Sequence, residues 1–315
     1  MTNFITGING FAASHLADCL LANGEEVSGV SRNSKKNSNV THIQEKIKTF
    51  QCDIGNLEEL KRVLEAIRPE KIYHLAAQSF VPTASDDGAA ILSSHFFGTF
   101  NLLEAAKHMG GITRVLWVGS AEEYGESVEL GQPINEDHPL QPDSLYGVGK
   151  ASADLLAQSY FKRGEVDVVR VRPFNHIGPR QDSRFAVSSF SKQISEIEKG
   201  ESQVIKTGNL DAQRDFTDVR DTVRAYFLVM EKGISGEVYN VCSGKLIKIK
   251  DILDRLVENA KVSIQVETEP ARVRSQDQKK LIGDFSKLTG VTGWKPEINL
   301  ETTLIDILNH WRLKM

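Results

Sequence analysis

Short apolar runs alternate with longer helical patterns through the first half of the chain, and no other feature of the sequence constrains the fold as strongly. The runs have the length of strands and are nearly continuously apolar, as in strands buried on both faces. We expect strands at residues 3–6, 26–30, 49–53, 71–75, 114–118 and 166–171, and helices at 11–23, 57–67, 98–108 and 146–162. Strands that alternate with helices in this way predict a parallel sheet covered by helices on both faces.

The pattern loosens after Pro173, where loops rich in Gly, Asn, Arg and Asp separate the helical stretches. We expect helices at 188–199, 221–232, 249–260 and 302–311, and a strand at 238–241 that returns to the main sheet. The prediction is an α/β fold, a Rossmann-type doubly wound parallel sheet with a smaller, discontinuous C-terminal domain. The larger domain would take residues 1–173 together with 215–243, and the smaller one 174–214 together with 244–315.

Charge and cysteine content exclude several classes of protein. The formal net charge of -4 gives no broad basic surface, so we expect no nucleic-acid partner. Cys19, Cys52 and Cys242 are odd in number and widely spaced, which argues against a disulfide framework or any metal site and favours a reducing cytoplasm. The first expected strand starts at residue 3, which leaves no room for a signal peptide, and no apolar run is long enough for a membrane span.

Glycines stand where the first expected strand turns into the first helix, in the segment Gly7-Ile8-Asn9-Gly10-Phe11-Ala12-Ala13. Bare glycines let the backbone approach a pyrophosphate, and the start of the helix supplies free N–H groups with partial positive charge. Glycine is also common in such turns for steric reasons alone. Its position in the first turn of the sheet favours a dinucleotide site, with Gly7, Asn9, Gly10 and Phe11 as cofactor contacts.

The end of the second expected strand indicates the type of dinucleotide. A carboxylate there would bind the adenosine ribose hydroxyls of NAD, but the chain has Ser31-Arg32-Asn33, with Lys35 and Lys36 beyond. A guanidinium can pair with a 2′-phosphate, so Arg32 predicts NADP(H) in preference to NAD(H). An exposed loop with basic residues is the alternative interpretation.

Two further strand ends fit the same site. Asp53 and Ile54 follow the third expected strand, where the carboxylate could accept the adenine amino group. The fourth strand ends in small residues that would let the backbone lie against the cofactor, Leu75-Ala76-Ala77-Gln78. We interpret His74, just before them, as a structural histidine.

Tyr146 and Lys150 open the expected helix at 146–162, and a separation of four residues places both side chains on one helix face. A tyrosine phenol has an ordinary pKa of about 10, and a neighbouring ammonium lowers it by favouring the phenolate. We expect Lys150 and the cofactor charge together to lower the pKa of Tyr146. Ser120 directly follows an apolar strand, where its hydroxyl could bind the same carbonyl or alkoxide. The three residues predict oxidoreductase chemistry on an alcohol or ketone.

With these residues the chain resembles the extended short-chain dehydrogenase/reductase family, the nucleotide-sugar epimerases, dehydratases and reductases, along essentially its entire length. Further segments carry the resemblance: residues 172–180, 208–210, 214–221, 240–244 and 293–296. The runs Phe-Asn-His-Ile-Gly-Pro and Arg-Asp-Phe-Thr-Asp-Val are most similar to the branch of GDP-mannose 4,6-dehydratase and GDP-4-keto-6-deoxy-mannose reductase. The resemblance implies a nicotinamide-binding larger domain and a substrate-binding smaller one.

The resemblance also implies which residues bind the nucleotide sugar. Asn175, Asn209, Arg214 and Arg274 match substrate positions of the family, and the arginines suit bidentate contacts with a diphosphate. Three more substrate contacts are predicted, with structural or solvated roles left open for the last two: Gln78, Arg180 and Asp277. Tyr146, Lys150 and Pro173 would contact the cofactor, His176 would lie near the nicotinamide, and Glu122 would also contact the substrate.

The segment around Ser120 bears on the reaction. A 4,6-dehydratase of the family has Thr-Asp-Glu or Thr-Ser-Glu, whereas this chain has Ser120-Ala121-Glu122, which keeps the glutamate and lacks its polar partner. The doubled Glu122-Glu123 resembles the reductase pattern, so we predict NADPH-dependent reduction of a GDP-linked 4-keto-6-deoxy sugar, with Ser120, Glu122, Tyr146 and Lys150 as catalytic residues. The alternatives are a GDP-mannose 4,6-dehydratase with Glu122 as the base, and a non-catalytic NADP-sensing regulator.

Two expectations concern helices. His95 stands where the family usually has an asparagine that steadies the central helix, and we expect a local change in packing there without loss of function. In the family, the helix at 98–108 and the helix carrying Tyr146 often form a dimer contact, so the resemblance implies a homodimer.

Overall fold

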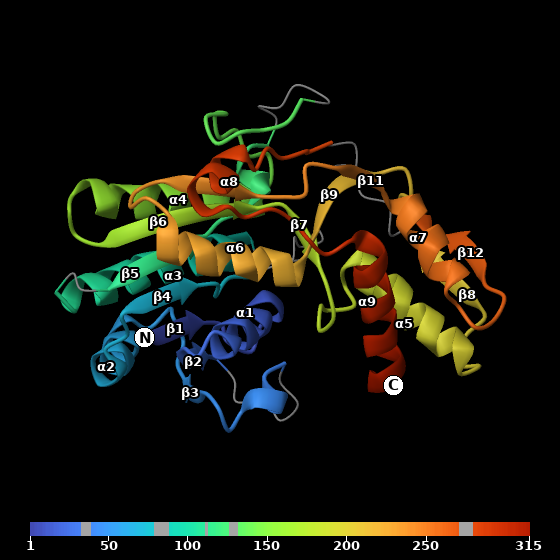
Figure 1. Ribbon diagram of the computed structural model, residues 1–315, viewed down its shortest axis with the longest axis horizontal. Helices are drawn as coiled ribbons and strands as arrows, with labels where there is room; N and C mark the ends of the chain where they lie inside the picture. Colours follow the sequence, from blue (N-terminus) through green and yellow to red (C-terminus); the bar gives the residue numbers. More distant parts are fainter. Residues whose placement is uncertain (33–38, 79–87, 111–112, 126–131, 271–279) are drawn as a thin grey trace.

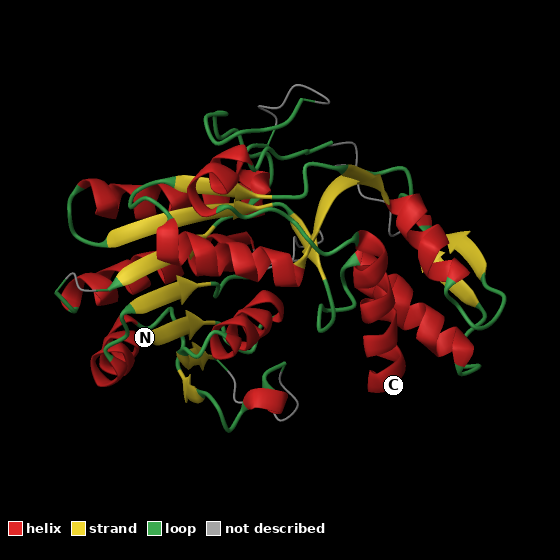
Figure 2. Cartoon of the chain, in the orientation of Figure 1, coloured by secondary structure: helices red, strands yellow, loops and turns green. Residues whose placement is uncertain are grey.

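A seven-stranded sheet forms the larger part of the computed structural model, which describes residues 1–32, 39–78, 88–110, 113–125, 132–270 and 280–315 (Figures 1 and 2). Its strand order is β10-β6-β5-β4-β1-β2-β3, and every neighbouring pair is parallel. The strands are β1 (Thr2–Thr6), β2 (Glu26–Ser31), β3 (Lys48–Gln51), β4 (Lys71–His74), β5 (Arg114–Val118), β6 (Asp167–Pro173) and β10 (Val238–Val241). The predicted doubly wound parallel sheet is confirmed.

Helices cover both faces of this sheet. One layer holds α2 (Leu57–Ile67), α3 (Gly88–His108) and α4 (Leu145–Lys162), and the other holds α1 (Phe11–Ala22), α6 (Val219–Lys232) and α8 (Ser286–Thr292). Successive side chains of a strand point to opposite faces. On β5, accordingly, Val115 and Trp117 pack in the first layer, and Leu116 and Val118 pack in the second. This burial on both faces explains why the strands are apolar throughout.

The smaller part of the molecule is built around α5 (Ala186–Glu198), α7 (Ile249–Glu258) and α9 (Leu300–Lys314), which share a second apolar core (Figure 1). Two small sheets belong to it, β11-β9-β7 and β12-β8. Their strands are β7 (Asn175–Ile177), β8 (Val204–Thr207), β9 (Gln213–Asp218), β11 (Leu246–Lys248) and β12 (Gln265–Thr268). β9 crosses residue 215, where we placed a domain boundary. The exact division into domains stays a prediction.

The order of the strands positions a crevice. The chain proceeds from β1 through β2 to β3 on one side of the sheet, and from β4 through β5 to β6 on the other. The connections after β1 and β4 therefore lead away from each other, and this leaves a crevice beyond the carboxyl ends of these two neighbouring strands. Loops after β1, β2, β4 and β5 open into it, among them the 3-10 turn η2 (Ala121–Glu123). A second such turn, η1 (Thr41–Ile43), lies before β3.

Asp215 joins three distant segments of the chain. Its carboxylate accepts hydrogen bonds from the backbone N–H groups of Ser243 (2.7 Å), Gly244 (2.9 Å) and Gly283 (3.1 Å). It is fully buried, and burial raises its pKa while these donors oppose the shift. The motif at 214–221 therefore has a structural function at this position, because it fixes β9 to the segment after β10.

Asp218 and Asp221 extend this connection to the end of the chain. Asp218 caps α6 and accepts a hydrogen bond from the Thr303 hydroxyl at 2.7 Å. Asp221 accepts from the backbone N–H groups of Glu297 and Ile298, both at 2.8 Å. The two carboxylates thereby hold the start of α9 against the sheet layer. Within the described ranges, no helix combines the length and apolar character needed to cross a membrane.

Candidate active site

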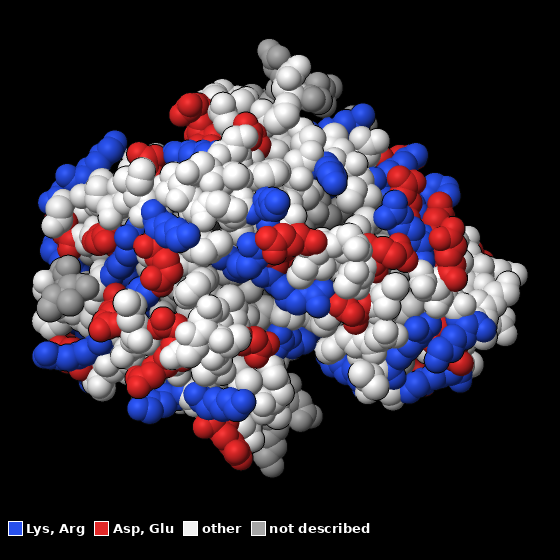
Figure 3. Space-filling view, in the orientation of Figure 1, with Lys and Arg blue, Asp and Glu red and all other residues white. Residues whose placement is uncertain are grey.

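A cleft of about 1720 Å³ lies between the sheet and the smaller part of the molecule. Lys and Arg are interspersed with Asp and Glu on the face shown in Figure 3, where the surface is hollowed between the two parts. All predicted site residues that the structure describes line this cleft: Gly7, Asn9, Gly10, Phe11, Arg32, Asp53, Ile54, Leu75, Ala76, Ala77, Gln78, Ser120, Glu122, Tyr146, Lys150, Pro173, Asn175, His176, Arg180, Asn209 and Arg214. Arg274 and Asp277 lie outside the described residues, as do Lys35 and Lys36.

The glycine turn brings backbone close to the cleft. Gly7 has a φ of +71°, and a Cβ added there would lie 3.0 Å from Cα of Ala76. Its backbone N–H donates to the carbonyl of Val30 at 2.8 Å, which fixes the turn against β2. Gly10 precedes α1 and offers no side chain to cap the first N–H groups of the helix. These groups are suited to bind an anion such as a pyrophosphate.

Arg32 follows β2 at the far end of the cleft. Its side chain is exposed, and it lines both the cleft and an adjoining pocket of about 510 Å³. Asp53 lies in the same pocket and accepts a hydrogen bond from the backbone N–H of Gly55 at 2.9 Å. Glu59 is a further carboxylate there. A cation at the end of β2 remains the feature that bears on the choice between NADP(H) and NAD(H).

His74 is buried beneath the cleft and does not line it. Its ring nitrogens lie 2.9 Å from the Thr6 hydroxyl and 3.2 Å from the Thr99 hydroxyl. Burial lowers the pKa of His74 to about 3, so the ring is neutral near pH 7. These contacts support the structural interpretation of this histidine.

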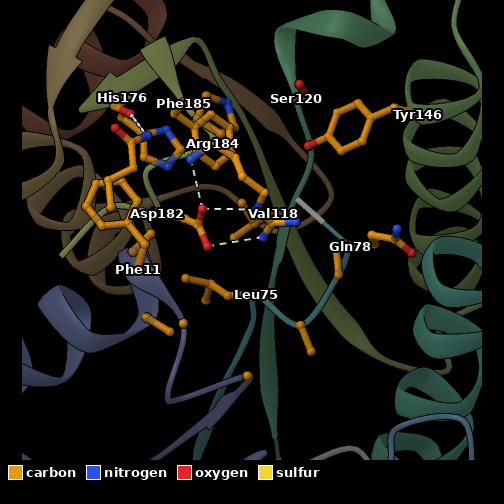
Figure 4. A pocket seen from close by; sticks show the side chains of 18 of the residues that line it. Phe11, Leu75, Gln78, Val118, Ser120, Tyr146, His176, Asp182, Arg184 and Phe185 are labelled. Carbon is orange, nitrogen blue, oxygen red and sulfur yellow. Dashed lines mark hydrogen bonds and ion pairs between the residues drawn. The ribbon is translucent and has the colours of Figure 1, made fainter. Parts of the chain in front are cut away.

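Ser120 and Tyr146 face each other across the cleft. Ser120 follows β5, and Tyr146 is the second residue of α4, which begins because Ser144 accepts a hydrogen bond from the N–H of Gly147 at 3.0 Å. Figure 4 shows the Tyr146 hydroxyl directed toward the strand end that carries Ser120. Burial raises the pKa of the Tyr146 phenol, and a hydrogen bond with the Ser120 hydroxyl opposes the shift. The phenol therefore keeps its proton near pH 7.

Lys150 lies one turn further along α4, as its spacing predicted. Its Nζ donates to the carbonyl of Val118 at 2.8 Å and lies 5.5 Å from the centre of the Trp117 ring. Burial lowers the pKa of Lys150 to about 8. A lowered pKa at Tyr146 is expected of Lys150 together with the cofactor charge, and it stays a prediction. The lysine donates to Val118, and burial of the phenol decides the direction.

Glu122 borders the cleft beside Tyr146, and its charge contributes to the raised pKa of the phenol. Its backbone N–H donates to the Ser120 hydroxyl at 3.2 Å. The preceding Ala121 is buried in an apolar cluster that also contains Tyr124 and Phe174. Position 121 therefore supplies no polar group to assist the Glu122 carboxylate.

His95 lies against Tyr146. Its ring meets the Tyr146 ring edge to face, with 5.1 Å between the centroids, and its Nε2 lies 3.0 Å from the Gln78 carbonyl. A Cβ added at Gly149 would lie 2.7 Å from its Nδ1. The expected local change of packing is thus a close contact among His95, Tyr146 and Gly149.

The opposite end of the cleft carries amides and a guanidinium. Asn175 comes from β7, Arg214 from β9, and Asn209 from the turn before β9. The Asn209 carboxamide oxygen accepts a hydrogen bond from the N–H of Asp211 at 2.9 Å, so its amide group can still donate. Segments far apart in the sequence thus gather groups suited to bind a diphosphate.

Arg180 lies apart from this group. Its guanidinium forms an ion pair with Asp18 of α1 at 2.7 Å and donates to the Asn39 carbonyl at 3.3 Å. Its backbone is left-handed, with a φ of 74°. Arg180 therefore ties the loop after β7 to α1, and its predicted substrate contact remains a prediction. His176, nearby, stacks on Phe11 with 5.8 Å between ring centroids (Figure 4).

Sequence reasoning missed two groups in the cleft. Asp182 and Arg184 form an ion pair of 3.0 Å, drawn in Figure 4, in the loop before α5. Lys314 reaches the same region from the end of α9. No motif marks these residues, because only the packing of α9 beside α5 brings position 314 to this wall.

Comparison with known proteins relates this geometry to function. The profile of the family described as GDP-mannose 4,6 dehydratase matches residues 4–307. The chain is 33% identical to the GDP-6-deoxy-D-mannose reductase of Pseudomonas aeruginosa, over 99% of this chain and 97% of the relative. It is 29% identical to the human GDP-mannose 4,6 dehydratase, over 97% and 90% of the two chains. The structure of RMD from Pseudomonas aeruginosa, complexed with NADPH, superposes with a TM-score of 0.86 at 31% identity and covers 100% of this chain and 99% of that one.

Proposed function

The chain belongs to the extended short-chain dehydrogenase/reductase family, among the NAD(P)-dependent nucleotide-sugar enzymes of the GDP-mannose 4,6-dehydratase group, and from this premise we propose that it is a reductase. Its substrate would be a nucleotide-linked 4-keto-6-deoxy sugar, GDP-4-keto-6-deoxy-D-mannose, and its product the GDP-6-deoxy sugar. The observation that carries the choice of reaction is the burial of Ala121 in an apolar cluster. A dehydratase needs an acid–base group at carbons 5 and 6, and here the Glu122 carboxylate has no polar side chain at position 121 to assist it.

The protein groups at the reacting carbonyl suit reduction. NADPH, when bound, supplies the hydride for carbon 4. The Ser120 hydroxyl can donate a hydrogen bond to the carbonyl oxygen and so orient it. Tyr146 can then give its proton to that oxygen as negative charge develops, and its raised pKa keeps the proton available near pH 7. The Lys150 ammonium donates a hydrogen bond to the end of β5, the strand that presents Ser120.

Two features support the ligands that we propose. Arg32 stands at the end of β2 and favours the 2′-phosphate of NADP(H), and the start of α1, which no side chain caps, favours the pyrophosphate. Arg214 and the amides Asn175 and Asn209 favour the diphosphate of the sugar nucleotide. The GDP-linked substrate is proposed from the relatives and from the motifs that carry the resemblance.

The experiment that tests the proposed reaction uses two substrates. With GDP-4-keto-6-deoxy-D-mannose and NADPH, we expect consumption of NADPH at 340 nm and formation of a GDP-6-deoxy sugar. With GDP-mannose and no added cofactor, we expect no keto sugar. A keto sugar in the second reaction contradicts the reductase proposal and supports the second candidate, a 4,6-dehydratase with Glu122 as its base. That candidate is favoured by the position of Glu122 beside Tyr146.

We also propose a homodimer built on α3 and α4. Four large apolar side chains are exposed on these two helices, although the helices pack on each other: Phe97, Leu145, Val148 and Leu155. Phe97 and Leu155 are each 57% exposed. Exposed apolar side chains gathered on one face are typical of protein interfaces. Sedimentation equilibrium tests the dimer, and Leu155→Glu should convert it to a monomer.

A further inference from the structure

We propose that Glu123 is a positioning residue that fixes Ser120 against the helix carrying Tyr146 and Lys150. This inference rests on the proposed function, because it concerns the geometry of the same reacting groups. Glu123 does not line the cleft, and its side chain is fully buried behind the strand end. It therefore acts through its neighbours.

One carboxylate oxygen of Glu123 holds the catalytic serine. Oε1 accepts a hydrogen bond from the backbone N–H of Ser120 at 2.7 Å, and the two residues form a capping box around η2. The site for this oxygen depends on Gly119, because a Cβ there would lie 2.3 Å from Oε1. The backbone N–H of Ser120 is thus fixed by Glu123, and its hydroxyl faces Tyr146.

The other oxygen leads to α4. Oε2 lies 3.1 Å from Nε of Arg172 on β6, and Arg172 donates in turn to the carboxylate of Asp154 with contacts of 2.9 and 2.5 Å. Asp154 stands four residues after Lys150, which stands four after Tyr146, so all three lie on one face of the helix. Arg170 donates to the second oxygen of Asp154 at 2.5 Å. The chain Ser120–Glu123–Arg172–Asp154 therefore connects the serine to the helix of the tyrosine and lysine.

A second connection joins the same two elements. Lys150 donates to the carbonyl of Val118, two residues before Ser120. The end of β5 and the first turns of α4 are thus joined at two places, one through Lys150 and one through Glu123 with Arg172. Two separate contacts fix the orientation of β5 relative to α4, whereas a single contact would allow one element to rotate about it. The separation of the Ser120 and Tyr146 hydroxyls follows from this orientation.

The charges of this buried group support the same role. Arg170, Arg172 and Lys150 are cations, and the carboxylates facing them are Glu123 and Asp154. Burial, the charge of Asp154 and a hydrogen bond with the Asp154 carboxylate raise the pKa of Glu123, whereas the Arg172 guanidinium and the Ser120 N–H oppose the shift and favour the ionised form. A neutral Glu123 would leave three buried cations against one carboxylate, which is costly in a low dielectric.

Lys150 depends on this charge. Glu123 raises the pKa of the ammonium against the dominant effect of burial. His74 and His95 face Lys150 from β4 and α3, but burial lowers their pKa values to about 3 and about 4, so both are neutral near pH 7. Among the described residues, Glu123 is the carboxylate whose charge raises the pKa of Lys150. Without its charge, Lys150 loses its proton at lower pH.

The test compares three variants of the full chain. Glu123→Gln keeps an acceptor for the Ser120 N–H and removes the charge, whereas Glu123→Ala removes both. Glu136→Gln is the matched control, because Glu136 also accepts a backbone N–H, that of Asn240 at 2.7 Å, but does not touch Ser120 or Lys150. Measurements are kcat and KM against pH, the melting temperature, and the titration of 13C-labelled lysine side chains by NMR, with the Lys150 signal assigned from its loss in Lys150→Arg.

We expect Glu123→Gln to lower kcat about ten- to hundredfold, with a smaller change in KM, because misplacement of reacting groups acts on the chemical step. Its alkaline limb of activity and the Lys150 titration should both move to lower pH, and Glu123→Ala should lose more kcat than Glu123→Gln. If Glu123→Gln matches Glu136→Gln in kcat and in both titrations, the proposal is overturned. If the wild-type enzyme turns over neither sugar, the proposed function is refuted but the role of Glu123 is not. The titration of Lys150 then tests that role: a shift to lower pH in Glu123→Gln supports it, and an unchanged titration contradicts it.

Discussion

Nζ of Lys150 lies 2.8 Å from the backbone carbonyl oxygen of Val118, so the catalytic lysine is bonded to the strand that ends in Ser120. The ammonium is buried at this contact, since the lysine is only 7% exposed. The protein thus holds a cation in a fixed place where burial disfavours it. A side chain held in this way loses little freedom when the reaction begins, which is the condition for efficient positioning.

Tyr146→Phe should lower kcat by about 10²- to 10⁴-fold, the usual contribution of a positioned proton donor, and should leave NADPH binding unchanged. Stopped-flow measurement of NADPH oxidation checks the first expectation, and fluorescence titration checks the second. Tyr160→Phe is the control on the same helix, since its hydroxyl donates to Glu104 away from the cleft. Full turnover by Tyr146→Phe would contradict the role of Tyr146 as the proton donor.

Arg32→Ala should raise the Michaelis constant for NADPH by about ten- to hundredfold and change that for NADH little, because a charge-assisted hydrogen bond contributes about 1.5–3 kcal/mol. The ratio of kcat/KM for the two cofactors measures this. Lys61→Ala, a surface change in α2 outside the cleft, is the control. A wild-type preference for NADH would contradict the assignment of NADP(H).

Gly7→Ala and Gly24→Ala separate backbone strain from contact with the cofactor. Both glycines have positive φ, +71° and +76°, so each substitution should lower the free energy of unfolding by about 1–2 kcal/mol. A Cβ at Gly24 meets nothing within 4 Å, whereas one at Gly7 approaches Ala76 in the cleft. Only Gly7→Ala should therefore weaken NADPH binding, as measured by fluorescence titration. Equal affinities in the two variants would place the pyrophosphate elsewhere.

His95→Asn should make the protein less sensitive to acid. Burial lowers the pKa of His95 from 6.5 to about 4, so the unfolded chain takes up the proton first as the pH falls. The contribution of the neutral ring is complete above about pH 6.5 and is lost toward pH 4, by about 1–2 kcal/mol between pH 7 and pH 5. Urea unfolding at these two values checks it, and we expect the loss to shrink by that amount in His95→Asn.

The exposed His108 provides the control for that experiment, because its ring contacts Glu65 on the surface. His108→Asn should leave the difference between pH 7 and pH 5 as it is in the wild type. A smaller difference in both variants, or in neither, would mean that the acid sensitivity arises outside the contact of His95 with Tyr146.

Local signals predicted the large sheet and the layout of the site well. The helix at 57–67 has the predicted bounds, because Asn56 caps its start and a proline follows its end. β5 also has the predicted bounds, because a short apolar run between polar turns is typical of a buried strand. The residues predicted at the ends of β1, β2, β4 and β5 line one cleft, because parallel strands bring their carboxyl ends to one edge.

The remainder depends on partners that are distant in the sequence. β7 and β11 have three residues each, and nothing in so short a run distinguishes a strand from a loop before β9 lies between them. The ion pair of Arg180 with Asp18 joins positions 162 residues apart. Spacing along α4 likewise does not reveal that Lys150 donates to the carbonyl of Val118.

The pairing of β10 with β6 has a consequence for how the protein is made. Strands β1 to β6 leave the ribosome first, but the outer edge of β6 stays open until Val241 has emerged, and by then α5 and the first small strands have already been synthesised. An open strand edge invites pairing with other chains. The nascent sheet is therefore exposed to aggregation while much of the other half is being translated, and a truncation before residue 238 would yield an incomplete sheet with β6 at its edge in place of an independent nucleotide-binding unit.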